Sequence, residues 1–160
     1  MGLLNFLLRP RLPLWQYCLV MWPLAMIPSL LVVALVVFVG GLFGLTALTG
    51  PDRTVDAADL LGSVLIAPLL ETLLIPVGLT LLSVFMRRSV ALAIGSAMLW
   101  GLGHGLLAPG RFAGSVWSFF VFSCAYLAWR ERGFWRALAA AGVPHALVNA
   151  TVFTFLLLDR

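Results

Sequence analysis

The chain has 160 residues, of which 62% are hydrophobic and 10% are charged, whereas soluble domains carry about 25% charged residues. Together with a mean hydropathy of +1.09, this composition excludes a soluble domain, and the length leaves room for a single membrane domain over residues 1–160. The net charge is +4 and every basic residue is an arginine. These arginines lie in short loops between apolar runs, where they set membrane topology rather than indicate a nucleic-acid partner.

The first 22 residues mix apolar side chains with aromatic and basic ones that suit the headgroup layer of a membrane. The aromatic and basic residues are Arg9, Arg11, Trp15, Tyr17 and Trp22. Pro23 and Pro28 follow without a small-residue cleavage site, so we do not expect a signal peptide. Residues 1–22 are therefore predicted to form an interfacial segment that leads into the first span.

Five apolar runs are each long enough to cross a bilayer, which takes about 20 helical residues. They cover residues 24–48, 60–86, 89–107, 112–129 and 137–158. Prolines, glycines and charged residues separate them. The sequence thus predicts an all-α integral membrane bundle of about five transmembrane helices plus the N-terminal interfacial segment.

The distribution of arginines predicts the orientation of this bundle. If the N-terminus is cytoplasmic, seven of the ten arginines lie on the cytoplasmic side. The seven are Arg9, Arg11, Arg87, Arg88, Arg130, Arg132 and Arg136, and the other three are Arg53, Arg111 and Arg160. Because cytoplasmic loops are enriched in basic residues, we expect a cytoplasmic N-terminus and an external C-terminus.

Glu71 is the only charged residue in the run 60–86. A carboxylate near the middle of a membrane helix costs at least a few kcal/mol and usually marks a functional site. Pro68 and Pro76 flank it, and each frees an upstream carbonyl, which is tolerated only against protein or water. We therefore expect Glu71 to face a polar pocket.

Three more polar side chains in the spans could line that pocket, namely His104, His145 and Asn149. His145 and Asn149 are four residues apart and so share one helix face. At helical rise, Glu71 and Asn149 lie roughly 16 and 14 Å from the outer ends of their spans. The four side chains can therefore meet in the middle-to-outer half of the membrane.

This set of residues permits the activation of water. A carboxylate shielded from bulk solvent can act as a general base, while a histidine such as His104 positions the water or passes on its proton. His145 and Asn149 can donate hydrogen bonds to the oxyanion formed when water attacks an amide. The sequence has no HExxH metal motif. Two histidines and one glutamate hold zinc in some hydrolases, so a zinc site stays open beside a metal-free one.

Three short patterns occur in order on separate spans. They are Ala67-Pro68-x-x-Glu71, Trp100-x-x-x-His104 and His145-x-x-x-Asn149. In this order they resemble the CPBP family, the CAAX-processing and bacteriocin-processing intramembrane proteases that are also called the Abi family. The resemblance covers residues 60–158, which would form the protease-like core.

The resemblance implies a glutamate-type mechanism without a resident cofactor. Glu71 would activate water with His104 as its partner, and His145 with Asn149 would form the oxyanion site. The substrate would be a membrane-anchored protein, cleaved near the membrane surface by an endopeptidase. The protein itself would lie in the inner membrane of a bacterium or an archaeon.

The chain departs from the family pattern at three positions. Thr72 and Pro76 stand where the family has a second glutamate and an arginine, and Trp100 replaces a phenylalanine. With an outward-facing pocket, these departures make prenylated CAAX substrates less expected. The chain looks more similar to bacterial relatives that cleave the C-terminal sorting tails of anchored proteins.

Structural roles remain alternatives for each of these residues. Glu71 could be a structural carboxylate bonded to Thr72 or Thr80, and His104 could be a packing histidine. His145 and Asn149 could be an interhelical hydrogen-bonding pair, since such residues often join membrane helices. Two other classes of function also stay open. One is a non-catalytic immunity or scaffold protein, and the less favoured one is a proton-coupled transporter, although no inverted repeat is present.

The glycines, hydroxyl residues and cysteines of the spans are expected to have structural roles. Gly101 and Gly105 form a small-xxx-small pair that lets a neighbouring helix approach closely. Ser63 and Thr80 have no general base nearby in sequence and are expected to bond back to their own helices. The two cysteines are expected to be buried small hydrophobes; they are Cys18 and Cys124.

Overall fold

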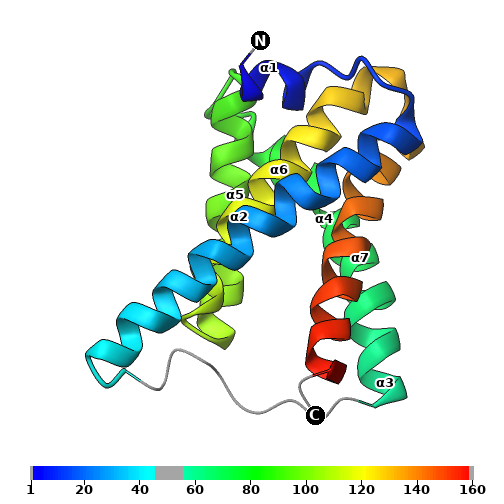
Figure 1. Ribbon diagram of the computed structural model, residues 1–160. Helices are drawn as coiled ribbons and strands as arrows, with labels where there is room; N and C mark the ends of the chain where they lie inside the picture. Colours follow the sequence, from blue (N-terminus) through cyan, green and yellow to red (C-terminus); the bar gives the residue numbers. More distant parts are fainter. Residues whose placement is uncertain (1, 46–55, 159–160) are drawn as a thin grey trace.

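The computed structural model describes residues 2–45 and 56–158, and every regular element in this part of the chain is a helix (Figure 1). The elements are α1 (Leu3–Leu8), α2 (Leu14–Leu42), α3 (Ala57–Leu60), η2 (Leu61–Ile66), α4 (Ala67–Leu82), α5 (Ser89–Leu107), α6 (Arg111–Trp129), η3 (Arg130–Arg132) and α7 (Phe134–Leu158). The π-helical segment η2 joins α3 to α4 without a break, and η3 is a short 3-10 turn.

Within the described residues, five helices are long and apolar enough to cross a membrane. They are Leu14–Leu42, Ala57–Leu82, Ser89–Leu107, Arg111–Arg132 and Phe134–Leu158. The predicted all-α membrane bundle is therefore confirmed. The ends of the last four spans differ from their predicted positions by at most four residues.

The first span differs more from its prediction. α2 begins ten residues before the predicted start and continues through both of its prolines, so residues 14–22 of the predicted interfacial segment belong to the spanning helix. Residues 46–48 of the predicted span lie outside the described part of the chain. Tyr17 is fully buried, and its hydroxyl donates to the carbonyl of Leu7 at 2.7 Å. This aromatic ring ties α1 onto the bundle instead of facing the headgroup layer.

A side chain from another helix allows α2 to continue past Pro28. A proline in a helix has no N–H for the carbonyl four residues earlier, which here belongs to Leu24. The indole Nε1 of Trp117 on α6 donates to that carbonyl at 2.8 Å. The freed carbonyl is thus satisfied inside the bundle, as the membrane requires.

The centre of the bundle is α6 (Figure 1). Over its most apolar stretch 56% of α6 is buried, against 17–28% in the other four spans, and it packs against α2, α5 and α7. Buried hydroxyls add polar links between these helices. Ser123 Oγ donates to Ser96 Oγ of α5 at 2.9 Å, and Ser29 Oγ of α2 donates to the carbonyl of Gly114 at 2.8 Å.

Glycines bring α5 close to the start of α6. A Cβ added at Gly101 would collide with the side chain of Val116, and one added at Gly105 would lie 3.1 Å from Cβ of Phe112. This is the close approach that the small-xxx-small spacing predicts. It fixes the end of α5 that carries His104.

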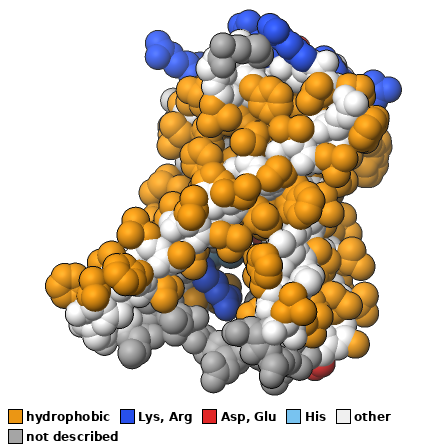
Figure 2. Space-filling model, viewed as in Figure 1, with side chains coloured by type: hydrophobic (Ala, Val, Ile, Leu, Met, Phe, Trp, Pro, Cys, Tyr) orange, Lys and Arg blue, Asp and Glu red, His pale blue; other side chains and the backbone are white. Residues whose placement is uncertain are grey.

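The two ends of the bundle differ in charge and in packing. Basic side chains gather at the end where α1 lies, whereas the last turn of α7 lies at the opposite end (Figures 1 and 2). The exposed arginines of the N-terminal segment, of the turns after α4 and α6 and of the first turn of α7 are Arg9, Arg11, Arg87, Arg88, Arg130, Arg132 and Arg136. At the α7 end the last turns of α2 and α7 diverge, and Figure 2 shows a hollow between them.

Candidate active site

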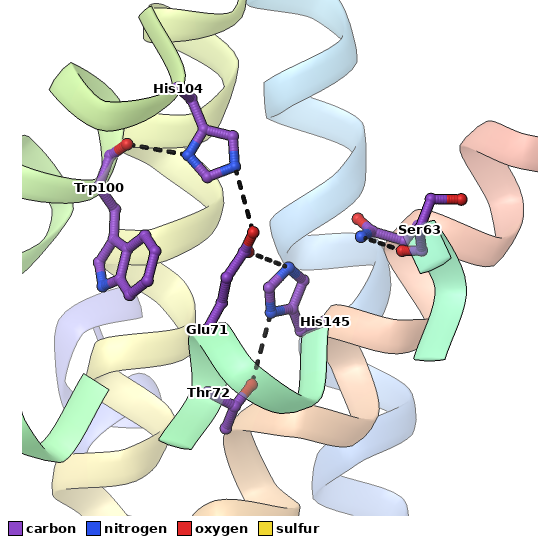
Figure 3. A network of polar contacts seen from close by, with 7 residues as sticks. Ser63, Glu71, Thr72, Trp100, His104 and His145 are labelled. Atoms are coloured by element: carbon purple, nitrogen blue, oxygen red, sulfur yellow. Dashed lines mark hydrogen bonds and ion pairs between the residues drawn. The ribbon is translucent and has the colours of Figure 1, made fainter. Parts of the chain in front are cut away.

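The carboxylate of Glu71 lies between two imidazoles that come from two other helices (Figure 3). Its Oε2 is 3.3 Å from Nε2 of His145 on α7, and its Oε1 is 3.8 Å from Nε2 of His104 on α5. Residues separated by more than seventy positions in the chain thus meet around one carboxylate. Three of the four predicted site residues are in direct contact or nearly so.

The three side chains differ in their access to solvent. Those of Glu71 and His104 are 22% and 25% exposed, whereas that of His145 is 4% exposed. The Glu71–His104 side of the cluster is therefore not fully enclosed by protein. His145 is enclosed and reaches the cluster only through its Nε2.

A hydrogen bond within α5 sets the tautomer of His104 in its neutral form. Its Nδ1 lies 2.9 Å from the carbonyl of Trp100, one turn earlier. Because a carbonyl only accepts, Nδ1 must carry the proton, and the Nε2 of the neutral ring is a bare acceptor. Two acceptors, this Nε2 and Oε1 of Glu71, then face each other. A water placed about 2.8 Å from each can donate one hydrogen to each of them.

The tautomer of His145 is opposite to that of His104. Its Nε2 faces the carboxylate of Glu71, so this nitrogen carries the proton and donates. Its Nδ1 lies 3.5 Å from the hydroxyl of Thr72, which can donate to it. Thr72 is buried, with 3% of its surface exposed. Glu71 and Thr72 are neighbours on α4 and together hold the two nitrogens of one ring.

Aromatic rings of α6 enclose both histidines. Phe122 stacks on His145 with ring centroids 4.6 Å apart, and Phe119 meets His145 edge-on at 5.2 Å. Phe119 also lies 5.2 Å from His104 and stacks on Trp100 at 4.7 Å. This wall restricts the rotation of both imidazoles and keeps lipid and bulk water from His145.

Sequence reasoning did not identify Thr72, Phe119 or Phe122 as part of the site. Thr72 was noted as a departure from the family pattern and as a possible structural partner of Glu71, but not as a partner of His145. The spacing of Phe119 and Phe122 places both on one face of a helix, but this signal is shared by ordinary core residues. Only the packing of α6 against α5 and α7 shows that they contact the histidines.

The fourth predicted residue, Asn149, contacts a different part of the molecule. It lies one turn after His145 on α7, and its Nδ2 donates to the backbone carbonyl of Ser63 in η2 at 2.8 Å. Ser63 lies apart from the cluster of Glu71 and the two imidazoles (Figure 3). The structure therefore joins Asn149 to the helix that carries Glu71 rather than to the carboxylate itself. The oxyanion role that the family resemblance implies for Asn149 stays a prediction.

The hydrogen bonds of the hydroxyl residues test the alternative that Glu71 is a structural carboxylate bonded to Thr80. Thr80 donates to the carbonyl of Pro76 and Ser63 to that of Asp59, so both hydroxyls bond back to their own helices as expected. Thr80 is therefore not the partner of Glu71. Both cysteines are buried free thiols, as expected; they are Cys18 and Cys124.

The grouping of potential ligand side chains bears on whether the site could hold a metal ion. Among residues 2–45 and 56–158, no three His, Cys, Asp or Glu side chains are grouped as ligands of one metal ion. The carboxylate of Glu71 meets the two imidazoles through different oxygen atoms. The site is a carboxylate–imidazole cluster, and a chelator tests the zinc alternative directly.

Comparison with known proteins adds no family to this geometry. No family model, no curated protein and no solved structure matches the chain.

Proposed function

We propose that the protein is an intramembrane endopeptidase of the CPBP type, which hydrolyses a peptide bond of a membrane-anchored protein near the membrane surface. The observation that carries this proposal is the carboxylate of Glu71, held between two imidazoles inside a membrane-spanning bundle. A largely buried carboxylate with a histidine acceptor opposite it is suited to removing a proton from water. The order of these residues along the chain agrees with the family resemblance.

The chemistry begins with a water between Oε1 of Glu71 and Nε2 of His104. Glu71 takes one proton of this water as its oxygen attacks the carbonyl carbon of the substrate, which forms a tetrahedral oxyanion. The proton then passes to the leaving amine, through Glu71 directly or through His104. The carbon–nitrogen bond breaks, and the products are a carboxylic acid and an amine.

His145 has two roles in this proposal. In the resting site its Nε2–H donates to Glu71 and orients the carboxylate. Once Glu71 holds the proton from water, that N–H is released from a charged acceptor and can donate to the oxyanion instead. This agrees with the oxyanion role that the resemblance implies for His145.

The proposed location is a bacterial or archaeal inner membrane, with the N-terminus in the cytoplasm. The end of the bundle that holds α1 carries seven exposed arginines, which favours the cytoplasmic side for this end. Of the three arginines predicted to lie outside, Arg111 is at the opposite end, at the start of α6. Arg53 and Arg160 lie outside the described residues.

The proposed partner is a protein anchored in the same bilayer, such as one with a C-terminal sorting tail. The hollow between the last turns of α2 and α7 lies at the end of the bundle away from the seven exposed arginines, and a basic side chain lies in it (Figure 2). A peptide that leaves the outer face of the membrane next to its anchor would enter from this side.

The test is cleavage of an anchored substrate by purified protein in liposomes, with and without a metal chelator. We expect cleavage by the wild type, also with chelator, and cleavage at least about 100-fold slower by Glu71→Gln or His104→Ala, both of which should fold. Glu131→Gln, at an exposed acid in η3, is the matched control and should cleave normally. Loss of wild-type cleavage with chelator, restored by zinc, would replace the metal-free mechanism by a zinc one.

A non-catalytic immunity or scaffold protein is the second candidate. It is favoured by Thr72 and Pro76, which stand where the family has a glutamate and an arginine. Thr72 is a buried neutral partner of His145, so the site has one acid where the family has two. This candidate predicts an unaltered biological function after Glu71→Ala, whereas the protease predicts its loss.

A further inference from the structure

The helix that carries Glu71 contains a widened turn just before Pro68. η2 is π-helical, and the N–H of Ala67 bonds to the carbonyl of Gly62, five residues earlier. In an α-helix this N–H would instead bond to Ser63. π-helical turns are uncommon and frequently occur at functional sites.

This turn leaves the carbonyl of Ser63 without a donor from its own helix. Its α-helical donor, the N–H of Ala67, is used by Gly62. Its π-helical donor would be the N–H of residue 68, but Pro68 has none. A buried carbonyl without a partner is costly in a membrane. Pro68 therefore both ends the π segment and creates the need for an outside donor.

Asn149 supplies that donor from α7. Its Nδ2 donates to the carbonyl of Ser63 at 2.8 Å. One turn earlier on the same face of α7, His145 contacts Glu71 at 3.3 Å. α7 thus holds the α3–η2–α4 run at two points, one at the π turn and one at the carboxylate, eight residues apart in that run.

We propose that Asn149 is a positioning residue. It places Glu71 by donating a hydrogen bond to the carbonyl of Ser63, which Pro68 leaves without a donor. This inference rests on the proposed protease function and gives Asn149 a role through Ser63 rather than a direct contact with the oxyanion. If the bond is lost, the π turn can relax and Glu71 shifts relative to His104 and His145. A shift of about 1 Å at a reacting group can lower turnover by about 10²-fold.

A double-mutant cycle between Asn149 and Pro68 tests this role. Asn149→Leu removes the donor at similar size, and Pro68→Ala returns a backbone N–H to the turn. With wild-type Pro68, we expect Asn149→Leu to lower kcat roughly 10- to 100-fold with little change in KM. In the Pro68→Ala background the same substitution should lower kcat less than about threefold, because the N–H of residue 68 satisfies Ser63. Equal losses in both backgrounds would overturn the inference and leave Asn149 as a direct oxyanion donor.

Two readouts do not depend on proteolysis. The melting temperature should fall for Asn149→Leu and recover when Pro68→Ala is added. Glu71 is the only acid within the described membrane spans apart from residues at their ends, so its labelling by a hydrophobic carbodiimide, located by mass spectrometry, reports its exposure. This labelling should change in Asn149→Leu and return in the double variant. Additive melting temperatures or unchanged labelling would overturn the inference even if the wild type shows no cleavage.

A matched control comes from α2 and α6. Trp117→Phe removes the donor to the carbonyl freed by Pro28, and Pro28→Ala returns an N–H there. We expect the same recovery of the melting temperature in this pair, but no change in kcat or in Glu71 labelling. A drop in kcat for Trp117→Phe as large as for Asn149→Leu would show that any loosening of the bundle lowers turnover, which contradicts a specific role for Asn149.

Discussion

Two prolines of this bundle each leave a backbone carbonyl without its helical donor, and a side chain of a neighbouring helix donates to that carbonyl instead. Pro28 frees the carbonyl of Leu24, which accepts from Trp117, and Pro68 frees that of Ser63, which accepts from Asn149. Both hydrogen bonds are 2.8 Å long. We call each of these two hydrogen bonds a repair of the interrupted helix. The same kind of bond is formed in both places, but the surrounding residues differ.

The residues around each of these two hydrogen bonds decide whether the bond has only a structural role or also positions the site. The Trp117 repair lies between α2 and α6, two helices that otherwise meet through apolar side chains and serine hydroxyls. The Asn149 repair lies on the helix that carries Glu71 and on the one that carries His145. The first holds the bundle together, whereas the second also sets the place of a carboxylate. A proline in a membrane helix can therefore be a device that ties a functional residue to its neighbour.

The largest expected loss of kcat comes from substitutions of Glu71 and His104. Glu71→Gln should lower kcat roughly 10²- to 10⁴-fold, the range for loss of a general base. The double variant with His104→Ala should lose little more than Glu71→Gln alone, because the two groups act on one water. Single-turnover cleavage by the purified variants measures this. Losses that multiply would mean that the two residues act in separate steps.

Thr72 gives a smaller effect at the same site. Thr72→Val keeps the shape but removes the hydroxyl that faces Nδ1 of His145, so His145 should orient Glu71 less well. We expect kcat to fall roughly 2- to 10-fold, the equivalent of one ordinary hydrogen bond. Thr72→Ser retains the hydroxyl and should restore most of the rate. If Thr72→Val cleaves like the wild type, the hydroxyl has no part in holding His145.

Trp117 gives the smallest expected effect on turnover, because its repair is only structural. Trp117→Phe leaves the carbonyl of Leu24 without its donor, so the melting temperature should fall by roughly 2–6 °C. The kcat of the folded protein should stay within about twofold of the wild type, because this hydrogen bond joins α2 to α6 and not the helices that carry Glu71, His104 and His145. Thermal unfolding in detergent and cleavage at a temperature well below the transition measure the two quantities. An unchanged melting temperature would mean that lipid or water satisfies this carbonyl.

Most of the fold could be predicted from the sequence because hydropathy and chain length restrict a membrane chain to a helical bundle. The start of α2 could not, because the aromatic and basic residues of 1–22 suit the headgroup layer as well as the start of a span. Pro28 is tolerated only because Trp117 reaches the freed carbonyl from a helix about ninety residues away in the chain. Local sequence carries no sign of that contact.

The site could be predicted in part. Glu71, His104 and His145 stand out because polar groups are costly in a membrane and tend to meet one another. The wall formed by Phe119 and Phe122 could not be predicted, since apolar residues carry no such signal. The contact of Asn149 with Ser63 depends on the π turn, which sequence spacing based on α-helices does not show.

The central claim is that Glu71 and His104 activate water for peptide hydrolysis inside the bundle. The most direct measurement is cleavage of an anchored substrate in water enriched in oxygen-18, with mass analysis of the new C-terminus and with Glu71→Gln run in parallel. Our account predicts one heavy oxygen in the new carboxylate in the wild type and cleavage roughly 10²- to 10⁴-fold slower by Glu71→Gln. Cleavage by Glu71→Gln at the wild-type rate would contradict it.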